Sequence, residues 1–185
     1  KFETKKQLQN AVTLWTNELG MLNPTTTAIE TYGDINTWDV SSISDFSYLF
    51  LNKITFNSDI SEWDVSNGNN FEAMFSGASI FNQDISSWDV SNGNDFSWMF
   101  SGASIFDQDI TPWTIDKNAE LTNMFYGALS MQSNRSVGNT PSIYYFNNPF
   151  PDKDTLKTAI DEWITNQVSA RGSYGDINTW DVSRV

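Results

Sequence analysis

Residues 83–107 read QDISSWDVSNGNDFSWMFSGASIFD, and this stretch decides the fold because the chain repeats it. The preceding residues, 58–82, are identical to it at 19 of 25 positions. Large apolar side chains recur at an interval of 25 residues, as tryptophan (Trp38, Trp63, Trp88 and Trp113), isoleucine (Ile35, Ile60, Ile85 and Ile110) and phenylalanine (Phe50, Phe75, Phe100 and Phe125). A fixed period of this length predicts a solenoid, in which each unit buries its apolar face by stacking on its neighbours.

The pattern of each unit predicts a strand followed by a short helix or 3₁₀ turn. Trp88 and Val90 are two residues apart, so in a strand their side chains share one face and Asp89 points to the other. Residues 96–103 carry apolar side chains at the spacing of one helical face, and Gly102 lets the chain leave that helix. The expected fold class is therefore α/β: a leucine-rich-repeat solenoid with short parallel strands on one face and short helices on the other.

The repeated stretches DISxWDVSNG and MFSGASxFNQD resemble those of the BspA-like leucine-rich-repeat surface proteins, over about residues 33–128. The resemblance implies a secreted or surface-displayed protein with adhesion and binding roles and no assigned catalysis. The expected localisation is thus extracellular or at the cell surface. Where that family has a valine, this chain has Gly68 and Gly93, and their Asn-Gly pairs predict turns with a positive φ.

The two flanks of the repeats match each other. Residues 2–15 and 150–163 align as amphipathic helices, and each is followed by a loop and the identical decapeptide YGDINTWDVS. The first helix predicts an N-terminal cap over the apolar end of the solenoid. The second either starts the next module of a tandem array, or a strand at 177–182 closes this same domain. The expected domains are 1–32 (capping helix and loop), 33–128 (four repeats), 129–149 (connecting loop) and 150–185 (second capping helix and start of a further repeat).

The composition argues against several classes of function. The 23 acidic and 10 basic residues give a net charge of -13, which disfavours nucleic acid or an anionic membrane surface as partner. No stretch approaches the roughly 20 apolar residues of a membrane span. Because the chain has no histidine and no cysteine, the usual general base and thiol nucleophile are missing, and we do not expect an enzyme.

Stacking would align the repeated aspartates in two rows. One row precedes the predicted strands (Asp34, Asp59, Asp84 and Asp109), and the other lies on their outward face (Asp39, Asp64 and Asp89). Like charges about 4.8 Å apart repel by about 3.5 kcal/mol at an effective dielectric of about 20. Either Ca²⁺ offsets this repulsion, with the outward row as its ligands, or turn amides and neighbouring Ser and Asn side chains do so. The second interpretation is favoured for the row before the strands, and no other cofactor is expected.

Three parts of the chain are candidate sites. An acidic, hydroxyl-lined concave face suits a cation, a basic partner or a sugar; it comprises Glu62, Asp64, Ser66, Ser87, Asp89 and Ser91. Tyr48 and Trp98 stand beside inward phenylalanines and should face outward, where they contact a partner chain or pack on adjacent helices. Asn134 begins the sequon Asn134-Arg135-Ser136, which predicts glycosylation if the protein follows a eukaryotic secretory route.

These features predict a non-catalytic extracellular repeat module for adhesion or for assembly of a surface structure or filament. Its expected partners are neighbouring copies of itself, other surface proteins or glycans. The alternative is a ligand-recognition domain that binds a glycan or a protein on the acidic concave face.

Overall fold

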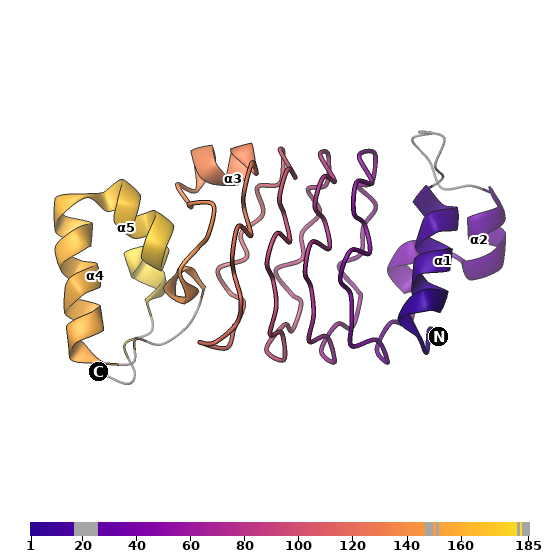
Figure 1. Cartoon of the computed structure of the whole chain (residues 1–185), viewed down its shortest axis with the longest axis horizontal. Coiled ribbons are helices and arrows are strands. Elements are labelled where there is room, and N and C mark those ends of the chain that lie inside the picture. Colours follow the sequence, from indigo (N-terminus) through magenta and orange to yellow (C-terminus); the bar gives the residue numbers. More distant parts are fainter. Residues whose placement is uncertain (17–25, 147–149, 151, 181, 183–185) are drawn as a thin grey trace.

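The repeat units form coils that lie side by side in a row, and helices stand at both ends of that row (Figure 1). The computed structural model describes residues 1–16, 26–146, 150, 152–180 and 182. The α-helices are α1 (Lys5–Thr16) and α2 (Thr26–Tyr32) at one end, α3 (Leu129–Asn134) after the last coil, and α4 (Lys153–Thr165) and α5 (Gln167–Tyr174) at the other end. The short 3₁₀ helices are η1 (Ile35–Thr37), η2 (Ile143–Tyr145) and η3 (Ile177–Thr179).

The predicted α/β leucine-rich-repeat class is wrong. Residues 33–128, all of which are described, contain no β-strand, and the coils meet in isolated parallel bridges that join Asp45 to Asn70, Asn70 to Asp95, and Asp95 to Glu120. The strand predicted around Trp88 is absent, and residues 96–103 form neither the α-helix nor the 3₁₀ helix predicted for them. The protein consists instead of a few helices attached to a body of turns, with a buried cluster of aromatic side chains.

Hydrogen bonds between coils explain why residues 96–103 form turns. The N–H groups of Phe96, Trp98, Phe100 and Gly102 donate to carbonyl groups of the next coil at 2.8 to 3.0 Å. Between them, alternate N–H groups donate three residues back within the coil, as in a β-turn. Trp98 (φ 59°) and Gly102 (φ 69°) have left-handed backbone conformations, which a type II turn requires at its third residue and an α-helix excludes.

The core consists of aromatic rings stacked from coil to coil. One row of rings has centroids 5.4, 5.5 and 5.8 Å apart and is formed by Phe50, Phe75, Phe100 and Phe125. The repeated tryptophans are buried, as predicted. The indole N–H groups of Trp63, Trp88 and Trp113 each donate to an isoleucine carbonyl of the preceding unit, as Trp63 does to Ile35 at 2.7 Å and Trp113 to Ile85 at 3.0 Å. These bonds satisfy buried polar groups and fix the register of one coil on the next.

Gly68 and Gly93 do not have the positive φ that their Asn-Gly pairs predicted. Both lie beneath the ring of the phenylalanine three residues further on. A Cβ on Gly68 would be 2.4 Å from Phe71 Cζ, and one on Gly93 would be 2.2 Å from Phe96 Cζ. Glycine is needed here because a ring packs directly on the backbone, and not because of the turn's dihedral angles.

Helix α1 lies across the end of the row beside the first coil (Figure 1). It is amphipathic, as predicted, and its buried face is made of Leu8, Ala11, Val12 and Trp15. The backbone N–H of Phe2 donates to the Asp39 carbonyl of the first coil at 2.9 Å. A capping box begins the helix, with Thr4 N–H donating to Gln7 Oε1 at 3.1 Å and Gln7 N–H to Thr4 Oγ1 at 3.3 Å.

The second flank carries α4 and α5 at the opposite end of the row (Figure 1). The segment predicted as a connecting loop, 129–149, contains α3 and η2, and its residues 147–149 lie outside the described residues. The alternative closing strand at 177–182 is not formed in its described part, where η3 occupies 177–179. The end of the second decapeptide, residue 183, also lies outside the described residues.

Candidate functional site

The outward aspartates close turns inside their own coils. Asp64 Oδ1 accepts hydrogen bonds from the backbone N–H of Ser66 at 3.1 Å and from its hydroxyl at 2.6 Å. The equivalent pairs in other coils are Asp39 with Ser41 and Asp89 with Ser91. The serine hydroxyl bond is the main reason that the pKa values of Asp39 and Asp89 lie below the ordinary value for aspartate. Local hydrogen bonds therefore stabilise the charged form of these carboxylates.

The row that precedes the predicted strands also accepts hydrogen bonds from turn amides, which confirms the interpretation favoured for it. Asp59 accepts from Ser61 N–H and Asp84 from Ser86 N–H, both at 2.9 Å. Among the residues that the structure describes, no three acidic side chains are grouped so that they could hold a metal ion. Calcium binding by the outward row stays a prediction, and this geometry does not support it.

The hydroxyl groups expected to line a ligand surface form bonds inside the stack. Ser66 and Ser91 bond to their own aspartates, and Ser87 Oγ donates to a carbonyl of the preceding coil at 3.4 Å. Glu62 is exposed, and its backbone N–H donates to Asn36 Oδ1 at 3.0 Å. The structure thus brings the residues of the predicted acidic face together, as parts of a network of hydrogen-bonded turns that repeats from coil to coil.

Exposed aromatic side chains project from the coils outside the turns that hold the aspartates. Tyr48 and Trp98 occupy equivalent positions and are 44% and 39% exposed. Tyr126, which sequence interpretation missed, is 52% exposed and contacts Trp98 with ring centroids 5.7 Å apart. The alternative, packing on the helices of adjacent repeats, does not occur because residues 33–128 contain no α-helix, and the helical residue beside Tyr48 is Lys5 of the capping helix α1. Tyr48, Trp98 and Tyr126 together make up an aromatic edge.

Acidic side chains flank Tyr48 in the aromatic edge. The Tyr48 hydroxyl is hydrogen-bonded to Glu72, which is the main reason that the pKa of Tyr48 rises to about 12. Lys5 Nζ lies 5.9 Å from the centre of the Tyr48 ring and pairs with Asp45 Oδ1 at 2.8 Å. Aromatic rings beside carboxylates suit a partner that combines apolar or sugar faces with cationic or hydroxyl groups.

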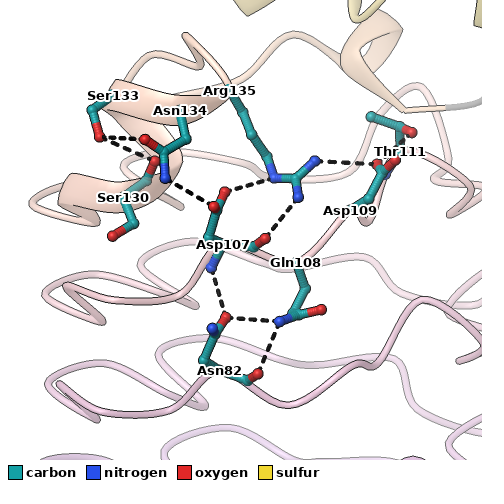
Figure 2. Close-up of polar contacts among 9 residues, drawn as sticks. All are labelled: Asn82, Asp107, Gln108, Asp109, Thr111, Ser130, Ser133, Asn134 and Arg135. Atoms are coloured by element: carbon teal, nitrogen blue, oxygen red, sulfur yellow. Dashed lines mark hydrogen bonds and ion pairs between the residues drawn. The ribbon is translucent and has the colours of Figure 1, made fainter.

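A polar row ends at Arg135, after the last coil (Figure 2). Asp107 N–H donates to Asn82 Oδ1 at 2.8 Å, and Gln108 Nε2 donates to the Asn82 carbonyl at 2.9 Å. Arg135 then donates from Nε to Asp107 Oδ1 at 2.9 Å and from Nη2 to the Asp107 carbonyl at 2.7 Å. The equivalent residues of earlier units are Asn57 and Asn82, so an acid replaces the amide where a guanidinium is present.

A cavity of about 240 Å³ lies beside Arg135, between the last coil and α5. Its wall carries two guanidinium groups, and each is paired with an aspartate: Arg135 with Asp109 at 3.9 Å, and Arg171 with Asp176. Tyr145 also lines the cavity, and burial raises the pKa of its hydroxyl. Because donors and acceptors are balanced, the cavity suits an uncharged polar ligand better than an anion.

Asn134 is exposed at the end of α3 rather than in a loop. Its Nδ2, the atom to which a glycan would be attached, donates to Asp107 Oδ2 at 2.9 Å (Figure 2). Glycosylation at this residue stays a prediction and requires that this hydrogen bond is given up.

The stacked coils, the helical ends and the exposed aromatic edge define a tandem-repeat protein. The family described as "Mycoplasma protein of unknown function, DUF285" matches residues 20–137 and 119–172, and the chain belongs to this family. No curated protein and no solved structure matched the chain. Within the described part, no helix combines the length and the apolar character needed to cross a membrane.

Proposed function

We propose that this protein is a non-catalytic extracellular repeat module that serves in adhesion or in assembly of a surface structure or filament. The observation that carries the proposal is the aromatic edge, where Trp98 and Tyr126 contact each other and remain about half exposed. Tryptophan and tyrosine are the side chains that most often dominate binding energy at protein interfaces. Exposed apolar groups rimmed by polar residues mark interaction sites.

The resemblance to BspA-like surface proteins supports the same function and an extracellular or cell-surface location. The duplicated helical flank supports the proposal that the module is one unit of a longer tandem array. The repeated carboxylates accept hydrogen bonds from serines of their own turns. Further units can therefore be added to the stack without any additional group to stabilise the carboxylate charges. The proposed partners are neighbouring copies, other surface proteins or glycans.

The test is binding of the purified chain to a glycan array and, by analytical ultracentrifugation, to itself. The double variant Trp98→Ala/Tyr126→Ala should weaken the binding detected in either assay by at least about tenfold, as expected of interface residues of this type. The matched control is Ile29→Ser, since Ile29 is 49% exposed and belongs to α2 and not to the coils. A parent chain that binds in neither assay, or a double variant that binds like the parent, overturns the proposal.

A second candidate is a ligand-recognition domain that binds a glycan or a protein. The cavity beside Arg135 and Arg171 favours it. In this case soluble monosaccharides should raise the melting temperature of the parent and of the aromatic-edge variant, but not that of Arg171→Met. An unchanged melting temperature with every sugar tested argues against this second candidate.

A further inference from the structure

The two helical ends contain the same cluster of four aromatic rings. At the first end, Trp38 contacts Phe2 at 5.2 Å between ring centroids, Trp15 at 5.6 Å and Tyr32 at 5.6 Å. At the second end, Trp180 contacts Phe150 at 5.2 Å, Trp163 at 5.8 Å and Tyr174 at 6.1 Å. The pairs Trp15–Trp38 and Trp163–Trp180 meet edge to face at nearly the same angle, 83° and 80°. The second end is therefore a capping unit by geometry as well as by sequence.

The first capping unit shows what such a cluster packs against. Helix α1 packs on the start of the stack, where Lys5 Nζ pairs with Asp45 of the first coil at 2.8 Å and the Trp15 indole donates to Ser58 Oγ, at the start of the second, at 3.0 Å. Val12 lies between these two contacts along the helix and is 1% exposed, so this face of α1 is covered. The occupant of this face is a coil that follows the decapeptide in the same chain.

The corresponding face of the second capping unit is uncovered. Ile160, the equivalent of Val12, is 37% exposed, and Trp163 is only half-buried. Lys153, the equivalent of Lys5, is exposed. The indole N–H of Trp180 is buried and has no hydrogen-bond partner in the described part of the chain, which is unfavourable for a buried donor.

The opposite side of the second capping unit already packs on a stack. Helix α5 approaches the preceding segment so closely that a Cβ on Gly172 would lie 2.1 Å from the Ser136 carbonyl oxygen. The residue at the equivalent position of α2 is Glu30, which is exposed. Glycine at position 172 lets the second capping unit pack closely on the stack that precedes it. The first capping unit has no glycine there, so only the second is suited to a position between two stacks.

We infer that the face of α4 around Ile160 and Trp163 binds a further coil of the 25-residue type, which continues from the second decapeptide. The second capping unit is then a joint that holds two stacks in one row. This inference rests on the proposed assembly function and names the partner of one of its surfaces.

The test lengthens the full chain by adding a copy of residues 44–185 after Val185. This continues the repeat in register, because Val185 is equivalent to Ile43. A Thr158→Ser change in the first copy distinguishes the internal α4 from the terminal one by mass. Hydrogen exchange of the internal α4 amides should be slower than in the parent by about tenfold or more, since local opening now requires undocking of a coil.

Two substitutions on the internal α4 make the test specific. Ile160→Asp should abolish the added protection in the lengthened chain and should change the exchange of the parent little. Ile164→Asp is the matched control, since Ile164 is 74% exposed on the same helix, and it should keep the protection. Unchanged exchange on lengthening, or protection that survives Ile160→Asp, overturns the inference. Concentration-dependent protection of α4 in the parent also overturns it, because a second copy would then occupy the face.

The outcome for this joint is independent of the aromatic edge. Loss of binding in Trp98→Ala/Tyr126→Ala tests the adhesion or assembly function, whereas exchange in α4 tests only the docking of a coil. Either result can fail while the other holds.

Discussion

A single methyl group at Gly93 should destabilise the stack through Phe96. The Cβ of a Gly93→Ala variant would lie 2.2 Å from Phe96 Cζ and 3.0 Å from the Val90 carbonyl oxygen. The ring cannot easily yield, because it stacks on Phe71 at 5.2 Å and contacts Trp113 at 6.3 Å. The added atom must therefore be accommodated by displacing a fully buried side chain or the backbone.

The expected cost follows from this geometry. Inserting a methyl group into a packed core costs about 1–3 kcal/mol, and the loss of glycine's freedom in the unfolded chain returns about 0.4–1 kcal/mol. A net loss of about 1–2 kcal/mol should lower the melting temperature by roughly 2–8 °C in a chain of this size. Thermal and urea unfolding, followed by circular dichroism and tryptophan fluorescence, measure this loss. Coincident transitions from the two probes are required, because repeat stacks do not always unfold in one step.

A double-mutant cycle with Phe96→Leu separates two explanations for the glycine. If the ring is the cause, Phe96→Leu should relieve much of the Gly93→Ala penalty, with a coupling of at least about 0.5 kcal/mol. The control is Gly102→Ala, where φ is 69° and the nearest surrounding atoms are 3.7 Å from an added Cβ. Its penalty comes from backbone conformation, so Phe96→Leu should not relieve it. An unchanged stability of Gly93→Ala, or strict additivity in the cycle, refutes the steric explanation.

Three further predictions concern hydrogen bonds and ion pairs. Trp88→Phe should destabilise the protein by about 1–3 kcal/mol in urea unfolding, because it leaves a buried carbonyl of the preceding unit without its donor at 3.2 Å. Arg135→Ala should lower the free energy of unfolding by about 1 kcal/mol. Adding Asp107→Asn should recover part of this loss, because it restores the asparagine of the earlier units. Equal stability of the single and double variants would contradict this. NMR titration should find the pKa of Tyr48 near 12, against an ordinary 10.0, and nearer the ordinary value in Glu72→Gln. Since the folded-state pKa is raised, this bond stabilises the protein below about pH 10 and the contribution is lost as pH rises towards 12.

The period of the sequence predicts which residues stack, because a repeat can bury its apolar side chains only against the same residues of its neighbours. Phe75 illustrates this by stacking on Phe50 and Phe100, and Trp63 by stacking on Trp38. The period does not predict the secondary structure within a unit. Two consecutive turns and a helix both place residues three apart on one side, so the pattern at 96–103 fits either. The recurrence of Gly77, Gly102 and Gly127 at one position was the available signal, and all three have a positive φ.

The candidate site was only partly predictable for a related reason. Tyr48 and Trp98 could be identified because the other units have a small or polar residue at the equivalent position. The aspartate rows suggested cations as long as only their mutual repulsion was considered. The recurrent Asp-x-Ser spacing, as at Asp64 and Ser66, was the signal for local hydrogen bonds that stabilise the charge. Arg135 and Tyr126 were missed because they lie where the repeat is breaking down.

Differences between otherwise identical units are therefore the better guide to function in this chain. Residues that recur in every coil are occupied by stacking and turn closure, so they cannot also be specific to one partner. Trp98 replaces the buried Ala73 at an exposed position and meets Tyr126 there. Asp107 replaces Asn82 and is bound by Arg135. In both places a change from the repeat coincides with a contact that the other units lack, which is what selection for a particular surface on a uniform scaffold would produce.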